Sequence, residues 1–205
     1  MRRLLAVPLL FLATSASAQG IPAFSVAADV GPAFPLGDFA DDGAERGWSA
    51  SVSAAARLTG LFGLYAGYER TWFDVGAAAD AADDTWTDSG LGAGVRMWFP
   101  VRPGARIHPW AQLGAGWHDL DPLIAGPEFS SIDTDGIITL EGGAGLDVAV
   151  AGERVFVRPA VRYRRYSFEA ESPGQTARTT VSSITVALGL MVVLNPGNDG
   201  SRRSP

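Results

Sequence analysis

The sequence predicts an all-β protein, folded as an eight-stranded antiparallel up-and-down transmembrane β-barrel. Three observations lead to this fold class. Eight stretches of about ten residues alternate between apolar and more polar side chains, and about ten residues is the length that a tilted strand needs to cross a bilayer. The connections between these stretches are alternately long and short. The more polar face of the strands combines glycine with charges of both signs, as expected inside a narrow barrel.

The first eighteen residues have the pattern of a secretory signal. Arg2 and Arg3 precede an apolar run over 4–13, and small residues then lead to an A-x-A cleavage site ending at Ala18. An apolar run of about ten residues is too short for a membrane helix, which needs about twenty. The sequence therefore predicts a signal peptide over 1–18, a barrel domain over 19–194 and a polar C-terminal tail over 195–205.

The composition argues against several kinds of function. The chain of 205 residues has no cysteine and two histidines, so disulfide scaffolds, thiolate catalysis and the usual zinc sites are not expected. Its net charge of −6 and isoelectric point near 4.8 argue against a nucleic-acid partner, because binding phosphates needs a basic surface. No cofactor or metal centre is expected.

The expected strands follow one another with a period of two. Apolar side chains occupy alternate positions from Phe24 in the first stretch, and from Trp48 in the second, where serines and small residues lie between them. Glycine and Arg96 separate the apolar residues of the fourth stretch, and arginines separate those of the seventh. The last stretch is the most regular, with Val or Leu at every second position from Val186. The eight stretches cover residues 24–31, 48–58, 64–72, 91–99, 107–118, 138–150, 155–164 and 183–194.

The connections carry a second signal, because their lengths are sorted. Polar segments near 35–47, 74–87, 119–135 and 169–180 are long, whereas those near 59–60, 103–104 and 151–153 are tight. This arrangement is typical of outer-membrane barrels, which have short periplasmic turns and longer extracellular loops. A soluble sandwich with Greek-key connections has no reason to sort its loops in this way.

The composition of the two faces indicates which one is inside. Glycine weakens a solvent-exposed strand face, but inside a narrow barrel it makes room for a long side chain from a neighbouring strand. We therefore expect the polar face to line the lumen and the apolar face to meet lipid. The expected polar network of the lumen comprises Arg57, Glu69, Arg96, Glu141, Asp147, Arg158, Arg162 and Arg164. Aromatic residues near the ends of the apolar face form the expected interfacial girdles, namely Trp48, Trp72, Phe99, Trp117 and Tyr163.

One hairpin can be predicted to the level of individual residue pairs. If its turn pairs Val150 with Val155, then Asp147 faces Arg158 and Glu141 faces Arg164, which places opposite charges together on the inner face. The same register sets Gly143 opposite Arg162, and it sets Gly142 opposite Tyr163 on the outer face. Because proline cannot donate to a strand ladder, irregular pairing is expected near Pro109 and Pro159.

These features together resemble a known family. The secretory signal, the segment from Gly31 to Phe39, the stretch from His108 to Gly116 and the apolar last strand are similar to the small eight-stranded outer-membrane barrels of the OmpA/OmpX type. The resemblance extends over nearly the whole mature chain. It implies a closed up-and-down barrel in the outer membrane of a Gram-negative cell, inserted there by the barrel insertion machinery and in contact with lipid and lipopolysaccharide.

The sequence leaves three functional hypotheses. The first is a non-enzymatic outer-membrane protein with a structural or surface-contact role, whose extracellular partner is unknown. The second is an enzyme that modifies lipid A, built around His118 beside Asp119, with a serine such as Ser89 or Ser167 supplied by another strand. No His-x-Ser sequence of the deacylase kind is present, so the first hypothesis is favoured. The third is a secreted soluble barrel with its apolar face inside and a small apolar ligand.

The expected outer connections are strongly acidic, with Asp88 and Asp119 counted among their carboxylates. Such a run is most often a solvated surface. The alternative is that these carboxylates capture divalent cations, which would bridge them to anionic lipopolysaccharide. No segment has the spacing of a dedicated calcium loop.

Overall fold

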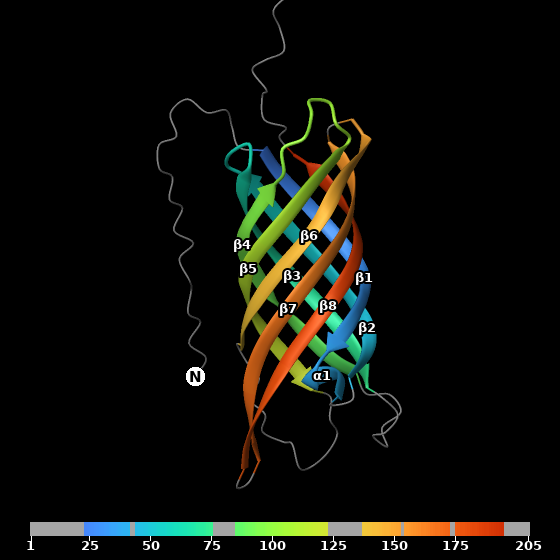
Figure 1. Cartoon of the computed structure of the whole chain (residues 1–205). Coiled ribbons are helices and arrows are strands. Elements are labelled where there is room, and N and C mark those ends of the chain that lie inside the picture. The colour runs from blue at the N-terminus through green and yellow to red at the C-terminus, as the bar shows by residue number, and fades with distance from the viewer. Residues whose placement is uncertain are drawn as a thin grey trace, which may run out of the picture.

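The protein is a closed barrel of eight antiparallel strands, as the sequence predicts (Figure 1). The computed structural model describes residues 23–41, 44–75, 85–122, 137–152, 154–172 and 175–194. The strands are β1 (Ala23–Leu36), β2 (Ala44–Arg57), β3 (Phe62–Val75), β4 (Thr85–Trp98), β5 (Ile107–Pro122), β6 (Ile137–Ala151), β7 (Val155–Ser172) and β8 (Gln175–Val193). The predicted signal peptide over 1–18 and the tail over 195–205 lie outside the described residues.

Every strand pairs with its neighbour in the sequence, and β8 closes the barrel by pairing with β1. The strands run diagonally around the barrel (Figure 1). Closure leaves no sheet edge with unpaired backbone groups, which is the condition for placing strands in an apolar medium. A short helix, α1 (Asp38–Asp41), follows β1. No helix in the described part of the chain is long and apolar enough to cross a membrane.

The strands are longer than predicted at the end of the barrel where the long connections lie, which we call the loop end. The segment 35–47, expected to be a loop, contains the end of β1, helix α1 and the start of β2. The segment 169–180, also expected to be a loop, is a hairpin in which β7 and β8 stay paired as far as Ser172 and Gln175. Its run of threonines has high strand propensity, so this polar segment extends the sheet. The cores of the other two long connections, 76–84 and 123–136, lie outside the described residues.

The opposite end, which we call the short-turn end, has the tight connections that the sequence predicts. After β2, the amides of Leu61 and Phe62 donate to Thr59 Oγ1 at 3.2 and 2.9 Å. After β4, the amide of Ala105 donates to the carbonyl of Arg102 at 3.0 Å, and Gly104 has a φ of 78°, which glycine adopts without strain.

The residue-level prediction for the hairpin of β6 and β7 holds over most of its length. Glu141 faces Arg164 and Gly142 faces Tyr163, as predicted. The turn itself differs, because Ala151 and not Val150 pairs with Val155. A bulge between Ala149 and Ala151 takes up the extra residue, so the register beyond it is unaffected.

The two prolines behave differently from each other. Near Pro159 the ladder of β6 and β7 is interrupted between the pairs Gly145–Ala160 and Val148–Val157, as expected. At Pro109 the β5–β6 ladder is unbroken, with Pro109 paired to Leu146, whereas the last pair of the β4–β5 ladder is Trp98–Trp110, next to the proline. The carbonyl of Pro109 accepts from the amide of Phe99, on the β4 side. The amide nitrogen of a strand residue points to the same side as its carbonyl, so the N–H that Pro109 lacks is not one that the β5–β6 ladder needs.

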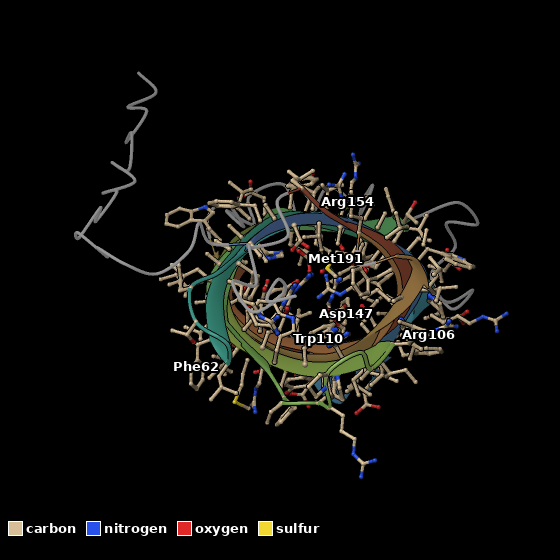
Figure 2. All side chains as sticks on the ribbon, turned by 90° about the horizontal axis from the view of Figure 1, so that it is seen from above. Phe62, Arg106, Trp110, Asp147, Arg154 and Met191 are labelled. Carbon is tan, nitrogen blue, oxygen red and sulfur yellow. The ribbon has the colours of Figure 1, made fainter. Side chains whose placement is uncertain are left out.

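The two faces of the barrel wall differ in composition. Leu91, Ile138 and Leu188 are exposed on the outside, with Ile138 retaining 73% of its accessible surface. Charged residues such as Arg96, Asp147 and Arg158 are buried. Viewed down the barrel in Figure 2, Trp110 and Asp147 lie inside the ring of strands, and many side chains project outward from it. The protein thus has the reverse of the distribution found in a soluble globular domain.

Candidate functional site

Side chains in three layers occupy most of the lumen. An apolar cluster closes the loop end, a network of ion pairs fills the middle, and arginines stacked on aromatic rings lie next to a cavity at the short-turn end. Glycines on the inner face make this filling possible. A Cβ atom at Gly92 would lie 2.5 Å from Glu141 Oε2, and one at Gly116 would lie 2.9 Å from Glu141 Oε1. These two positions give the Glu141 carboxylate its space.

Arg162 connects three other strands in the middle of the lumen. Its guanidinium on β7 donates to Asp29 on β1 and to Glu69 on β3, the latter at 3.2 Å. It also donates to the hydroxyl of Ser51 on β2 at 2.6 Å. Asp29 is a member of this network that the predicted set omits, although the alternation of the first strand puts it on the inner face.

Arg164 forms a second junction, closer to the loop end. It contacts Glu69 at 2.7 Å, Asp88 at 2.7 Å and the more distant Glu141 at 3.8 Å. Asp88, assigned from the sequence to the acidic outer connections, is therefore a buried lumenal residue. It lies within β4, which extends beyond the predicted strand of 91–99 because Thr85 to Gly90 pair with β3 and β5.

His118 belongs to the same network and lacks a serine partner. It retains only 1% exposure, and its Nδ1 and Nε2 atoms lie 2.7 Å from Asp88 Oδ1 and 3.1 Å from Glu141 Oε1. The adjacent Asp119 is exposed, on the other face of the strand. Of the two candidate serines, Ser167 is hydrogen-bonded to Thr180 at 3.1 Å.

Ser89, the other candidate serine, pairs with Asp119 and not with His118 in the β4–β5 ladder. Both ring nitrogens of the histidine thus face carboxylate oxygens, so the catalytic grouping considered in the sequence analysis is not assembled. A carboxylate accepts hydrogen bonds and does not donate them. A histidine protonated on both nitrogens satisfies both of these contacts.

The arginines nearer the short-turn end interact with rings more than with carboxylates. The guanidinium carbons of Arg96 and Arg158 lie 4.8 and 4.2 Å from the ring centroid of Trp110. Arg96 also donates to Gln112 Oε1 at 2.7 Å, and Arg158 Nε lies 3.5 Å from Asp147 Oδ1. Cation–π contacts of this kind are most favourable when the groups are desolvated.

Arg57 stands apart from the other predicted lumenal charges. Its guanidinium carbon lies 4.6 Å from the ring centroid of Trp98, at the short-turn end. No carboxylate of the described residues makes an ion pair with it. The predicted polar network is divided into two groups of charges, one in the middle of the lumen and one nearer the short-turn end. The group in the middle of the lumen also contains Asp29, Asp88 and His118, which the predicted set lacks.

An apolar cluster of α1 and the strand ends around it closes the loop end. Phe39 of α1 is fully buried, and its ring packs edge-to-face on Phe73 with centroids 5.1 Å apart. The remaining members of the cluster are Ala33, Ala44, Tyr166 and Val181, with Trp86 and Ile137 packed against it. Sequence reasoning missed this closure because Phe39 lies two residues after Gly37, in a segment with no strand periodicity.

The aromatic residues predicted as interfacial girdles all lie on the outer face. Trp48 pairs with Trp72 across β2 and β3, near the loop end, and Trp117 is 61% exposed on β5. Phe99 is exposed at the short-turn end, where it follows β4. Tyr163 lies in the middle part of β7 opposite Gly142, farther from the strand ends than the other four.

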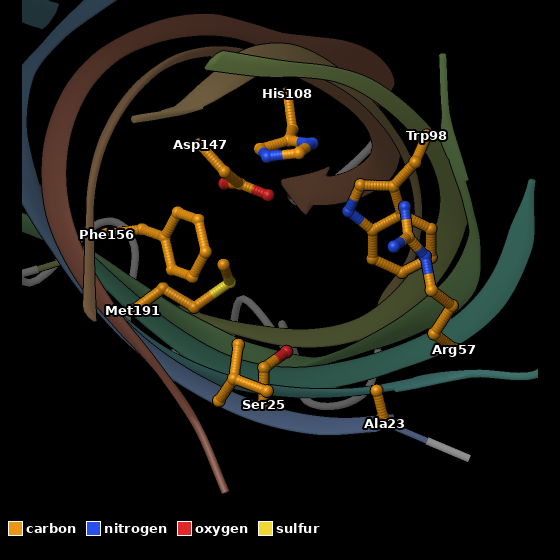
Figure 3. A pocket seen from close by; sticks show the side chains of 9 residues that line it. Ala23, Ser25, Arg57, Trp98, His108, Asp147, Phe156 and Met191 are labelled. Carbon is orange, nitrogen blue, oxygen red and sulfur yellow. The ribbon is translucent and has the colours of Figure 1, made fainter. Parts of the chain in front are cut away.

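A cavity with a volume of about 100 Å³ lies at the short-turn end, between Arg57, Asp147 and Phe156 (Figure 3). Cavities of about 40 and 10 Å³ lie nearer the middle of the barrel, next to Glu69 and Glu141. The described residues contain no group of three or more histidine or carboxylate side chains arranged to hold a metal ion.

Comparisons with known proteins show the fold. No family model and no curated protein matches the sequence. Among solved structures, Neisserial surface protein A is similar, with a TM-score of 0.58, 19% identity and coverage of 82% of this chain and 96% of that one. The outer membrane protein OprG from Pseudomonas aeruginosa has a TM-score of 0.54 at 14% identity, covering 85% and 95%. The outer membrane protein AlkL has a TM-score of 0.53 at 11% identity, covering 89% and 95%.

The fold is that of the small outer-membrane barrels. At these identities the likeness extends to the path of the chain and not to an activity. The function must therefore be argued from the surfaces and the lumen of this chain.

Proposed function

We propose that this protein is an integral β-barrel of the Gram-negative outer membrane, exported with a cleaved signal peptide, and that it is not an enzyme. Its role is structural or lies in surface contact through the acidic connections at the loop end. The short-turn end faces the periplasm and the loop end faces outward, as in barrels of known orientation. Its partners are lipid, lipopolysaccharide and the barrel insertion machinery.

The reversed distribution of charge is the observation that carries this proposal. Arg158 is completely buried in the lumen, whereas Val52, Leu91 and Leu188 are more than half exposed on the outside. In water, an apolar surface surrounding the whole barrel would drive association. In a bilayer the same surface is solvated by lipid, and the closed ladder satisfies the backbone. The soluble barrel with an apolar interior does not fit this distribution.

The filled lumen supports a role that involves no transport. Arg162 and Arg164 span the middle of the barrel with ion pairs, and Phe39 covers them at the loop end. An eight-stranded barrel is just wide enough for its side chains to fill it. A continuous aqueous channel would require these buried pairs to separate.

The position of His118 supports the absence of lipid A chemistry. An enzyme acting on an acyl chain needs a nucleophile or base that the lipid can reach from the outer face. His118 is buried inside the wall between two carboxylates. We expect cells that express the protein, its His118→Ala variant or neither to have the same lipid A mass spectrum. An acyl change that requires His118 would establish the enzyme instead.

Heat modifiability tests the main proposal. Inner and outer membranes are separated from cells expressing the protein, and each fraction is run on a denaturing gel with and without boiling. We expect the protein in the outer-membrane fraction, with a change of mobility on boiling, because a closed barrel resists detergent until heated. Recovery of the protein in the soluble periplasm, without a mobility change, would contradict the proposal.

A further inference from the structure

The cavity at the short-turn end is not used by the proposed function. Seven of the eight strands contribute residues to its lining, and β3 contributes none. Figure 3 shows Asp147, Phe156 and Met191 on one side of it and Trp98 with Arg57 on the other. Ser25 and Val193 near the mouth are only partly buried, so the cavity is accessible from the end of the barrel. Under the proposed orientation it opens to the periplasm.

The walls of this cavity combine apolar surface with unsatisfied polar atoms. Phe156 and Met191 pack together in a cluster that contributes its apolar surface. The Nε atom of Arg57 and the Oδ1 atom of Asp147 are buried and have no hydrogen-bond partner. Unpaired polar atoms beside a cavity cost free energy, and an anionic ligand that accepts a hydrogen bond from Arg57 removes that cost at the guanidinium, though not at Asp147.

The charge around the cavity favours an anion. Behind Asp147 lies Arg158, whose three guanidinium nitrogens are all buried without a hydrogen-bond partner. Arg96 shares the ring of Trp110 with Arg158 and adds another cation. Together with Arg57 these groups outnumber Asp147, the one carboxylate that lines the cavity. An ammonium group placed near Asp147 would have to compete with Arg158, which already lies 3.5 Å away.

We propose that this cavity binds a small monocarboxylate with an apolar body, a ligand of about the size of benzoate. The carboxylate of the ligand lies against the Arg57 guanidinium, which makes no ion pair with a carboxylate of the described residues. The apolar body of the ligand lies against Phe156 and Met191. The volume of about 100 Å³ is somewhat smaller than the roughly 150 Å³ of an enclosed cavity that holds benzene, and this cavity is open at its mouth. A charged hydrogen bond then combines with burial of an apolar ring.

Binding can be measured by ligand-observed NMR, with the folded protein in lipid nanodiscs and empty nanodiscs as the control for partitioning. Benzoate, benzyl alcohol and benzylamine present rings of the same size with a negative, neutral or positive group. We expect benzoate to bind most tightly and benzylamine least. Preferred binding of benzylamine, or no benzoate signal above that of empty nanodiscs, would overturn the proposal.

Variants test the role of the charged residues that line the cavity. Arg57→Gln should weaken benzoate binding about tenfold, since it removes a charge-assisted hydrogen bond. Asp147→Asn should strengthen it, because a carboxylate beside the ligand is removed. Arg102→Gln, an exposed residue of the turn after β4, removes the same charge from the same end and should change the affinity less than about twofold. An equal loss in Arg57→Gln and Arg102→Gln would mean that only general charge acts, and would refute the site.

A filling variant separates a defect in folding from a defect in binding. Ser25→Phe places a ring in the cavity from β1 and should abolish benzoate binding, while the mobility change on boiling is retained. Retained benzoate binding in this folded variant would place the ligand elsewhere and overturn the proposal. The gel reports on the barrel and the NMR signal on the cavity, so failure of the proposed membrane function and failure of this inference are distinguishable.

Discussion

At the scale of single residues, the lumen depends on a few arginines that each hold several carboxylates. Arg164 is the clearest case, because Glu69, Asp88 and Glu141 all lie within 4 Å of its guanidinium nitrogens. The carboxylates are themselves largely buried, so water could not fully hydrate them if the arginine were removed. A buried ion pair adds little relative to an apolar pair, but removal of one partner leaves an uncompensated charge.

Replacing Arg164 should therefore destabilise the barrel strongly. We expect Arg164→Met to lower the free energy of unfolding by about 3–5 kcal/mol, measured by urea titration in lipid vesicles with tryptophan fluorescence. The control is Arg165→Met, which removes the same side chain from the adjacent, exposed position of β7. It should cost less than about 1 kcal/mol. Equal losses would show that the lumenal contacts of Arg164 contribute nothing specific.

Glycines provide a second residue-scale test, because those on the inner face of the barrel wall have closer neighbours than those on the outer face. A Cβ at Gly92 would come within 2.5 Å of Glu141 Oε2, whereas one at Gly142 would meet nothing nearer than 4.0 Å. We expect Gly92→Ala to destabilise by about 1–3 kcal/mol through overpacking. Gly142→Ala should be close to neutral in the same urea titration. A neutral Gly92→Ala would mean that the carboxylate of Glu141 has another position available.

At the scale of elements, helix α1 closes the loop end of the barrel. A helix of four residues has little stability of its own, so its position depends on burying Phe39 against Phe73 and Trp86. The sheet packs against it, since Val181 and Tyr166 belong to the same cluster. The contact links the β1–β2 connection to β7 and β8, on the other side of the β1–β8 pairing that closes the barrel.

Truncating Phe39 should loosen this closure. We expect Phe39→Ala to lower the free energy of unfolding by about 3–5 kcal/mol, the usual range for a buried phenylalanine. Phe34→Ala is a matched control, because Phe34 lies on the outer face of β1 and is 39% exposed. Its loss should be smaller. A Phe39→Ala variant as stable as the parent would indicate that the barrel does not depend on the apolar cluster.

At the scale of the whole molecule, the filled lumen makes a prediction about conductance. Purified protein added to planar bilayers should give no discrete channel steps under an applied voltage, because ion pairs and the apolar cluster occupy the lumen. A porin added to the same bilayer is the positive control. Regular steps in proportion to the amount of this protein would show that the lumenal ion pairs open, and would favour a transport role.

The sequence by itself determined the number of strands, their antiparallel order and the two sets of residues that face in opposite directions. These properties follow from the period of two, which is local to each strand and needs no knowledge of the neighbours. The pairs Glu141–Arg164 and Gly142–Tyr163 could also be predicted from the sequence, because a tight turn restricts the register of the hairpin that it connects. Beyond hairpins of this kind, alternation says only that a side chain points inward.

The tertiary structure decided which inward charges meet. Arg162 reaches Asp29 although 133 residues separate them, and Arg164 reaches Asp88 although 76 residues do. Such contacts across the lumen depend on the tilt and stagger of all the strands, which closure of the barrel imposes. The position of α1 over the lumen was decided in the same way. It depends on packing partners that are distant in the sequence, such as Phe73 and Val181, so no local pattern predicts it.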